Sequence, residues 1–237
     1  MTHKVVTVSN GKPYQWYYLY DHFYKSLENL GETPLTVTYN VPWGGLSTKP
    51  KWLYSAIKQG CIKEDIMVFV DSWDLVFARP LEEMIERYLS FDVDIVCSSE
   101  LNCFPEDLKD EFDKVAAPTD YKYLNSGCIV GKTEAILTCL EAMDLPNLPD
   151  DYYDAEKKCN VHPNDQFEWM KIWVKQPVSI ALDYYQSLSQ TMHNADMGQF
   201  EINKHGIKNL ITGSYPSTFH YNGAAKSQVD IREPILK

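Results

Sequence analysis

The sequence predicts an α/β fold in which a mostly parallel central sheet is flanked by helices. Short β-branched and apolar runs alternate with stretches of helical periodicity along the first half of the chain. Five consecutive apolar residues at 66–70 are typical of a strand buried on both faces in the middle of a parallel sheet. With 237 residues, 44% of them hydrophobic, the chain fits a single domain over residues 1–237.

The first half is expected to alternate regularly between strands and helices. In chain order the expected elements are a strand over 5–8, a helix over 17–30, a strand over 35–39, a loop over 41–50, a helix over 51–59, a strand over 66–70, a helix over 81–89 and a strand over 93–98. Gly31 and Gly60 mark helix ends, because glycine readily adopts the left-handed conformation that terminates a helix. This β-α-β alternation indicates parallel strands joined by crossover helices.

The second half of the sequence is less regular. The expected elements are a strand within 123–131, a helix over 134–143, an acidic loop over 146–163, a helix over 165–174 and a short strand over 180–183. The sequence contains no repeat, low-complexity segment or interdomain linker. We therefore expect all of its motifs to lie on one folded unit.

Composition and charge exclude several classes of partner. The formal net charge of −11 argues against a broad basic surface for nucleic acid or anionic membranes. The first residues lead directly into a strand, and no apolar run approaches the roughly 18 residues that a membrane span needs. The six cysteines form no C-x-x-C pair, and Cys97, Cys128 and Cys139 are expected as buried, reduced thiols. We expect a protein of the cytoplasm of the producing or infected cell, with no membrane partner.

Two aspartates directly follow the buried strand. Asp71 and Asp74 stand where the strand end should open onto a cleft, because ligands of open α/β sheets bind outside the carboxyl ends of the strands. Carboxylate oxygens suit hard divalent cations, and such a cation can hold a diphosphate. The alternative is an ordinary turn whose aspartates cap the helix expected over 81–89.

Four further motifs follow in order along the chain. They are Ser99-Glu100 with Cys103-Phe104-Pro105, then Tyr123-Leu124-Asn125-Ser126-Gly127, then Asn164-Asp165-Gln166, and finally His220-Tyr221-Asn222-Gly223. Together with Asp71-Ser72-Trp73-Asp74, they resemble the glycosyltransferase domain of the procollagen lysyl hydroxylase family and its relatives among viral and procollagen sugar transferases. The resemblance runs from about Val5 to Lys226. Each motif alone is weak evidence, whereas five in the same order are specific.

The resemblance implies a GT-A (Rossmann-like) nucleotide-sugar glycosyltransferase fold, a UDP-sugar donor and Mn²⁺ as cofactor. It assigns Asp71, Asp74 and His220 as the metal ligands. Two carboxylates and one imidazole, with two diphosphate oxygens and water, complete an octahedral site that suits Mn²⁺. For His220 the alternative is a structural histidine satisfied by hydrogen bonds. The donor is expected to be UDP-glucose or UDP-galactose.

The resemblance also assigns contacts to the donor. Trp73 would stack on the uracil ring, a contact worth about 1–3 kcal/mol per base, and the alternative is a core tryptophan. The other donor-binding residues would be Val8, Ser9 and Asn10 at the uridine, Lys49 and Lys226 at the diphosphate, and Asn125, Ser126 and Gly223 around the sugar. A metal and lysines aimed at a departing UDP lower the barrier, because they neutralise the charge that develops on it. The alternatives are surface lysines and an ordinary turn.

Two acids are candidates for the chemistry itself. Asp165 is expected at the start of a helix, where the helix dipole stabilises a carboxylate, and its alternative role is the N-cap. Glu100 is the next candidate. The family has an acidic run before Gln166, of which this chain keeps only Asp165, and a tryptophan where this chain has Phe104. The wall on the acceptor side is therefore expected to differ.

The sequence thus predicts a metal-dependent glycosyltransferase that moves a hexose from a UDP-sugar to a hydroxyl acceptor. By resemblance, the acceptor is hydroxylysine or glycosylated hydroxylysine of a protein. One alternative is a glycosyltransferase acting on a glycan or on hydroxylated bases of viral DNA, against which the acidic charge weighs. Another is a catalytically idle GT-A domain that binds nucleotide. The stereochemistry of transfer is left open, and a homodimer is compatible with the sequence.

Overall fold

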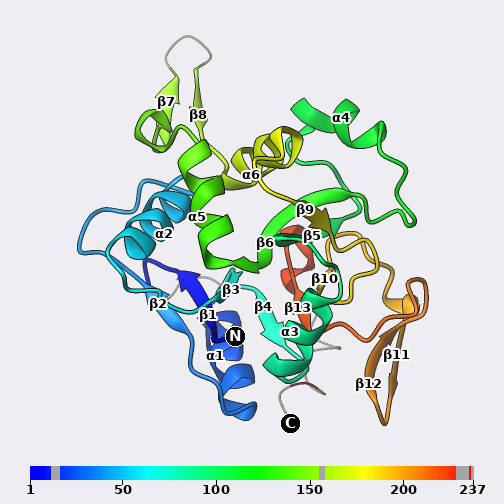
Figure 1. Ribbon diagram of the computed structural model, residues 1–237. Helices are drawn as coiled ribbons and strands as arrows, with labels where there is room; N and C mark the ends of the chain where they lie inside the picture. Colours follow the sequence, from blue (N-terminus) through cyan, green and yellow to red (C-terminus); the bar gives the residue numbers. More distant parts are fainter. Residues whose placement is uncertain (12–16, 155–157, 228–234, 236–237) are drawn as a thin grey trace.

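The computed structural model describes residues 1–11, 17–154, 158–227 and 235. Its centre is a six-stranded sheet with the order β2-β1-β3-β6-β5-β9 (Figure 1). The strands are β1 His3–Val8, β2 Leu35–Val37, β3 Ile66–Val70, β5 Ile95–Glu100, β6 Tyr123–Lys132 and β9 Ile180–Leu182. All neighbouring pairs are parallel except those of β6, which is antiparallel to both β3 and β5. The expected α/β class with a mostly parallel sheet is confirmed.

Helices cover both faces of this sheet. They are α1 Tyr17–Asn29, α2 Thr48–Lys58, α3 Leu81–Leu89, α4 Lys109–Asp113, α5 Thr133–Ala142 and α6 Asp165–Lys175. One buried cluster joins one face of the sheet to α2, α5 and α6 through residues such as Trp52, Ile136 and Trp169. A second cluster joins the other face to α1 and α3. Strand β3 contributes to both clusters because successive side chains of a strand point to opposite faces.

A second, three-stranded sheet lies beside the first and positions the end of the chain. It contains β10 Ser189–Thr191, β13 Thr218–His220 and β4 Leu75–Phe77, in that order. Strand β13 is antiparallel to β4, so that His220 pairs with Leu75, and the amide of Tyr221 donates to the carbonyl of Asp74 at 2.7 Å. The sequence analysis missed these three-residue strands, although it predicted the equally short β9.

Two hairpins and four 3₁₀ turns complete the described part of the fold. The hairpins are β7 Tyr152–Asp154 with β8 Cys159–Val161, and β11 Phe200–Asn203 with β12 Gly206–Asn209. The 3₁₀ turns are η1 Glu106–Leu108, η2 Leu145–Asn147, η3 Met197–Gln199 and η4 Gly223–Ser227. The prediction of a continuous loop over 146–163 is therefore wrong, because parts of this range form η2, β7 and β8. The loop expected over 41–50 ends early, because α2 begins at Thr48 and its first turn tolerates Pro50, which lacks an amide hydrogen.

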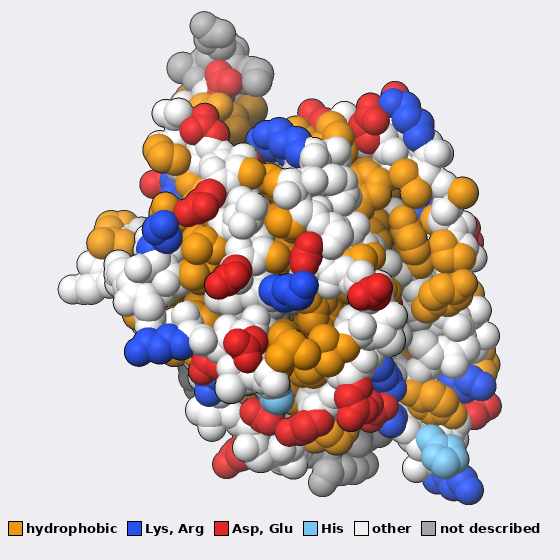
Figure 2. Space-filling view, in the orientation of Figure 1, with side chains coloured by type: hydrophobic (Ala, Val, Ile, Leu, Met, Phe, Trp, Pro, Cys, Tyr) orange, Lys and Arg blue, Asp and Glu red, His pale blue; other side chains and the backbone are white. Residues whose placement is uncertain are grey.

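The surface and the thiols agree with the composition. Acidic and basic side chains are interspersed over the face shown in Figure 2, without a continuous basic area. The six cysteines are free thiols, and Cys97, Cys128 and Cys139 are buried as expected. In the described ranges, no helix is both long and apolar enough to cross a membrane.

Candidate active site

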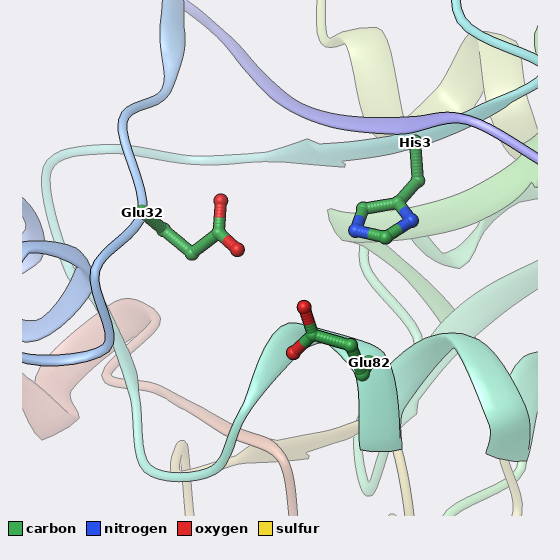
Figure 3. Close-up of side chains that lie close together, drawn as sticks. All are labelled: His3, Glu32 and Glu82. Atoms are coloured by element: carbon green, nitrogen blue, oxygen red, sulfur yellow. The ribbon is translucent and has the colours of Figure 1, made fainter.

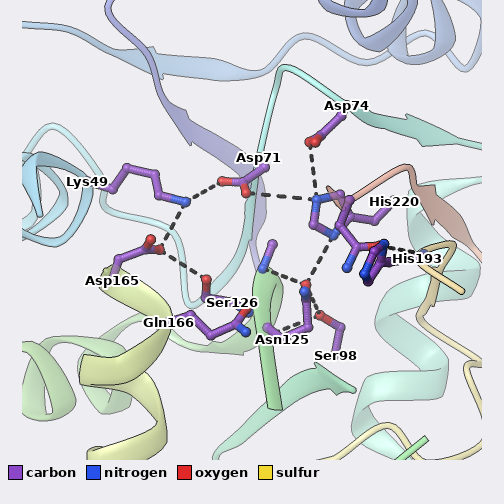
Figure 4. Close-up of polar contacts among 12 residues, drawn as sticks. Lys49, Asp71, Asp74, Ser98, Asn125, Ser126, Asp165, Gln166, His193 and His220 are labelled. Carbon is purple, nitrogen blue, oxygen red and sulfur yellow. Dashed lines mark hydrogen bonds and ion pairs between the residues drawn. The ribbon is translucent and has the colours of Figure 1, made fainter. Parts of the chain in front are cut away.

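The three residues expected to bind metal come together at the carboxyl end of β3 (Figure 4). Asp71 and Asp74 flank the turn that follows β3, and His220 arrives from β13 through its pairing with β4. Each contributes one ligand atom, and these atoms lie within 4.8 Å of one another. The Nε2 atom of His220 is 3.1 Å from Oδ1 of Asp74 and 3.9 Å from Oδ2 of Asp71.

Hydrogen bonds orient the ring of His220. Its Nδ1 atom is 3.1 Å from Oδ1 of Asn125, and that same oxygen accepts the backbone amide of Gly127 at 3.0 Å. Because this oxygen only accepts, Nδ1 donates to it, and Nε2 is the ring atom that faces the two carboxylates. Residue 127 has to be glycine, because a Cβ there would overlap the imidazole.

A buried lysine joins one of these aspartates to the candidate catalytic acid. Nζ of Lys49 is 2.8 Å from Asp71 and 2.9 Å from Asp165, whose side chain is only 3% exposed. The hydroxyl of Ser126 donates to Asp165 at 3.1 Å. Burial raises the pKa of Asp165, against the opposing effect of Lys49. Burial alone would lower the pKa of Lys49, but the two carboxylates overcome this and raise it.

Two of the alternative roles are wrong. Asp165 is not the N-cap of α6, because Oδ1 of Asn164 accepts the amide of Gln166 at 2.9 Å. The Asp165 carboxylate instead lines a cleft, here called the cleft, together with Lys49, Asp71, Asp74, Glu100, Asn125, Ser126, Gln166 and His220. Asp71 and Asp74 do not cap α3, because β4 follows Asp74 and Pro80 precedes the helix. The sequence shows that Asn164 and Asp165 are both able to cap α6. Only the backbone conformation decides which of the two side chains bonds to the helix amides.

Glu100 is buried in the wall of the cleft and is bound by three amides. Its Oε1 accepts from Asn125 at 3.0 Å and from Gln166 at 2.9 Å, and its Oε2 accepts from Asn222 at 3.0 Å. Burial raises the pKa of Glu100, and the hydrogen bonds of Asn125 and Gln166 partly offset this. The carboxylate therefore orders the amides around it.

Gln166 and Asn222 are site residues that the sequence analysis did not single out. Gln166 links three parts of the cleft, because its Oε1 accepts the amide of Ser126 at 3.1 Å while its Nε2 donates to Glu100 and to the carbonyl of Phe104. Oδ1 of Asn222 accepts the amides that follow β10. Gln166 belongs to the motif at 164–166 and Asn222 to the motif at 220–223. This membership was the feature of the sequence that could have identified them as site residues.

A neighbouring pocket shares Leu46, Lys49, Asp71 and Asp74 with the cleft, and three of the expected uridine contacts, Val8, Ser9 and Trp73, line it. Its other lining residues are Trp43 and Ser72. Trp73 is half-buried, and its indole N–H donates to the hydroxyl of Ser9 at 3.3 Å, so this tryptophan is not enclosed in the core. Trp43 was missed because it lies in a segment without periodicity. Its ring packs edge-on against Trp52.

Of the remaining residues predicted to contact the donor, some line the cleft and others do not. Asn125, Ser126 and Gly223 line the cleft. Asn10 is exposed beside the pocket-lining Ser9. The backbone of Lys226 lies in η4, and its side chain falls outside the described part of the structure.

A second group of side chains that could bind a metal lies at the amino-terminal end of β1, away from Val8 and Ser9. His3, Glu32 and Glu82 bring one ligand atom each to within 4.8 Å of one another, and Figure 3 shows the two carboxylates facing each other beside the imidazole. Glu82 is exposed, and the other two are half-buried. Because solvent screens exposed carboxylates, their proximity alone does not indicate a bound ion.

The fold is that of a GT-A glycosyltransferase. It is similar to the crystal structure of a glycosyltransferase involved in the glycosylation of the major capsid of PBCV-1, with a TM-score of 0.53 and 12% identity over 99% of this chain and 98% of that one. It is also similar to the galactosyltransferase LgtC in complex with donor and acceptor sugar analogues, with a TM-score of 0.51 and 11% identity over 98% and 95% of the two chains.

The chain belongs to the PLOD GT domain family, whose model matches residues 21–233. An uncharacterized protein of Acanthamoeba polyphaga mimivirus, R699, is 32% identical over 176 residues, which are 73% of this chain and 34% of that protein. Human multifunctional procollagen lysine hydroxylase and glycosyltransferase LH3 is 24% identical over 228 residues, which are 89% of this chain and 29% of LH3. The chain thus spans about a third or less of the length of these relatives. The suspected family and the glycosyltransferase class are both confirmed.

Proposed function

We propose that the protein transfers a hexosyl group from UDP-glucose or UDP-galactose to a hydroxyl acceptor, with Mn²⁺ held by Asp71, Asp74 and His220. The observation that carries this proposal is the Nε2 atom of His220, which faces two carboxylates while Nδ1 donates to Asn125. Oxygen ligands with one imidazole nitrogen suit Mn²⁺. A metal-bound histidine usually donates its other ring N–H to an oxygen acceptor that fixes the ring, and Oδ1 of Asn125 is in that place here. Bound there, the cation would supply positive charge to the diphosphate of the donor.

The pocket next to the metal ligands is proposed to hold the uridine. Trp73 offers its ring to the base, and Trp43 offers a second apolar wall. The buried Val8 and Ser9 stand at the end of β1, where nucleotides bind in open α/β sheets. Because the pocket shares Asp71 and Asp74 with the main cleft, a nucleotide lying here would place its diphosphate over the metal ligands and its sugar in the cleft.

Lys49 and Asp165 are proposed to act on the reacting bonds. Lys49 is held between Asp71 and Asp165, so in this proposal its charge would lie next to the diphosphate and the anomeric carbon of the donor. In an inverting reaction, Asp165 would take the proton of the acceptor hydroxyl, and a pKa raised by burial suits that role. In a retaining reaction, the same carboxylate would face the anomeric carbon. Ser126 orients this carboxylate in either case.

Asp165 is favoured over Glu100 as the reacting acid. Both oxygens of Glu100 are engaged by amides, whereas Asp165 is bound by Lys49 and Ser126 at the floor of the cleft. By family, the acceptor is proposed to be hydroxylysine or galactosyl-hydroxylysine. Lys226 is retained as a proposed contact to the diphosphate.

The experiment that tests the function measures UDP release. The protein is incubated with UDP-glucose or UDP-galactose, with Mn²⁺ or with EDTA, and with or without peptides that carry hydroxylysine or galactosyl-hydroxylysine. We expect UDP release that requires Mn²⁺ and rises with one of the peptides. Binding of UDP without release from either donor would identify an idle nucleotide-binding domain, and equal release in EDTA would contradict the metal assignment.

A further inference from the structure

One wall of the nucleotide pocket is a turn with two adjacent glycines, residues 43–46, here called the diglycine turn. Trp43 and Leu46 of this turn line the pocket, and Gly44 and Gly45 separate them. Gly45 has φ +99°, a conformation that glycine adopts readily. Two successive glycines give the backbone many accessible conformations, and fixing one of them costs conformational entropy. The position of this wall therefore depends on what packs against the turn.

Two aspartates from a distant part of the chain pack onto these glycines. Asp150 and Asp151, here called the acid pair, lie between η2 and β7. A Cβ added to Gly44 would be 2.3 Å from Cγ of Asp150, and one added to Gly45 would be 2.0 Å from Oδ1 of Asp151. The two carboxylates therefore occupy the space into which any other residue of the turn would project its side chain.

Hydrogen bonds attach the acid pair to the turn and to the start of α2. The amide of Asp151 donates to the carbonyl of Gly44 at 2.7 Å. Oδ1 of Asp150 accepts from Nζ of Lys51 at 2.8 Å and from the hydroxyl of Ser47 at 3.4 Å. The turn is thus held by its backbone and by the residues that follow it, and the contacts come from one short segment.

The acid pair has a second anchor at the base of the β7–β8 hairpin, which projects on the side of α2 and α5 in Figure 1. Asp151 directly precedes β7, and its Oδ2 atom lies 3.0 Å from Nδ1 of His162, which directly follows β8. Two residues later, Asn164 caps α6. The acid pair is therefore held between α2 and the segment that leads into α6, so it is a fixed support for the diglycine turn.

From these contacts we infer that Asp150 and Asp151 are positioning residues, which hold the diglycine turn where Trp43 and Leu46 can enclose the nucleotide. The inference rests on the proposed function, because it concerns the donor pocket of the same enzyme. Neither aspartate lines the pocket or the cleft, so the effect passes through the backbone of the turn. A wall that is ordered in advance loses less conformational entropy when the ligand binds, and the ligand binds more tightly.

The effect on folding should be small, which separates positioning from stability. The side chain of Asp150 is 60% exposed, and exposed ion pairs contribute little to the free energy of unfolding. Variants of the acid pair should therefore remain folded, with melting temperatures close to that of the parent. What they should change is the order of the turn and the affinity for the nucleotide.

The double variant Asp150→Ala/Asp151→Ala tests the inference by two measurements. Hydrogen exchange of the backbone amides of residues 43–48, without ligand, should be faster than in the parent. UDP affinity in Mn²⁺ should fall about three- to tenfold, the scale of one side chain that must be ordered on binding. The KM for the donor should rise by a similar factor while kcat stays within about twofold of the parent. Asp150→Asn/Asp151→Asn keeps the volume over the glycines and should retain most of the affinity.

A double-mutant cycle tests the contact itself. The Cβ of Gly44→Ala would displace the carboxylate of Asp150, which can rotate outward because it is exposed. Gly44→Ala should therefore weaken UDP as Asp150→Ala does, and the double variant should bind UDP no more weakly than either single variant. Additive losses would show that the two residues act separately and would overturn the inference.

Glu141→Ala is the matched control. It removes from α5 another exposed carboxylate that pairs with a lysine of α2, Lys58, at 3.1 Å, and it should change neither exchange nor affinity. The inference is overturned if the alanine variants of the acid pair bind UDP as the parent does, if exchange over 43–48 is unchanged, or if kcat falls as much as affinity. A parent that binds no UDP, with exchange still faster in the acid-pair variant, would contradict the proposed function and leave the support of the turn standing.

Discussion

At one end of the cleft, Lys49, Asp71 and Asp165 are joined by ion pairs and are largely buried. At the other end, Phe104 is 63% exposed and Nε2 of His193 makes no hydrogen bond to the described residues. The first end is built on regular elements, since Lys49 lies in α2, Asp71 directly follows β3 and Asp165 is the first residue of α6, whereas the second is built from segments between elements. A charged centre on regular elements keeps its geometry, because many contacts hold it. Side chains on connecting segments can be exchanged without disturbing that centre.

Asp74→Ala should have the largest effect of the variants. That effect should be confined to the end of the cleft that holds Lys49, Asp71 and Asp165. The variant loses one of the three proposed metal ligands, so Mn²⁺-dependent UDP binding should disappear and turnover should fall on the order of 10³-fold. Isothermal titration of UDP with and without Mn²⁺ measures this, and the melting temperature serves as the check on folding. If the parent protein binds UDP equally well in both conditions, the metal site is misassigned.

Asp165→Asn separates chemistry from donor binding within the same end. The amide keeps the hydrogen bond from Ser126 but loses the charge, so turnover should fall roughly 10²-fold or more while UDP–Mn²⁺ affinity changes little. The melting temperature should drop modestly, because the buried Lys49 keeps only Asp71 as a partner. Turnover at the parent level would move the catalytic role to another acid, with Glu100 next.

Trp73→Ala tests the nucleotide pocket. The loss of a stacking contact should weaken UDP by about 1–3 kcal/mol, and Trp73→Tyr should retain most of the affinity. The half-buried position of Trp73 predicts that both variants remain folded. A folded Trp73→Ala protein with unchanged UDP affinity would place the base elsewhere in the cleft.

Asp94→Asn should have the smallest effect and should spare the cleft altogether. Asp94 binds Lys132 at 2.8 Å and the hydroxyl of Ser179 at 2.7 Å, and these contacts lower the pKa of Asp94 to about 2. A depressed pKa stabilises the fold above the ordinary value of 3.8, and this contribution is lost as the pH falls toward about 2. The variant should lose less than about 1 kcal/mol at neutral pH, because the pair is partly exposed.

The pH dependence of that loss is the measurement. Urea unfolding at neutral pH and near pH 3 should show the difference between Asp94→Asn and the parent shrinking in acid. Turnover should match the parent, because Asp94 pairs with groups away from the cleft. A difference in stability that grows in acid, or a loss of turnover, would contradict this assignment.

The longer apolar runs predicted the fold well, whereas several three-residue strands were missed, although β2 and β9 were predicted. The apolar run before Asp71 identified β3 and, through it, the position of the cleft. The three-residue strands β4 and β13 have no readable period, so nothing in the residues alone showed that His220 would lie beside Asp74. Only the resemblance of the motif at 220–223 to the family indicated that His220 belongs to the site.

The predicted site was more complete for charged groups than for amides and aromatics. Charged residues after a strand are conspicuous, whereas Gln166 and Asn222 act through hydrogen bonds that depend on the tertiary structure. Trp43 and His193 lie in irregular segments, where sequence spacing says nothing about direction. The roles first weighed for Asp165 also needed the structure, because adjacent Asn164 and Asp165 are equally good caps until the backbone is known.

The two imidazoles of the cleft each lie directly over the backbone of a glycine. His220 lies on Gly127, and His193 lies on Gly223. In a deep mutational scan, both glycines should therefore tolerate almost no substitution, although neither carries a chemical group that could react. An experimenter ranking positions by intolerance alone would place them among the catalytic residues. Matching each intolerant glycine to the imidazole packed against it would separate two kinds of intolerant position. One kind carries a group that takes part in the reaction, and the other only leaves space for such a group.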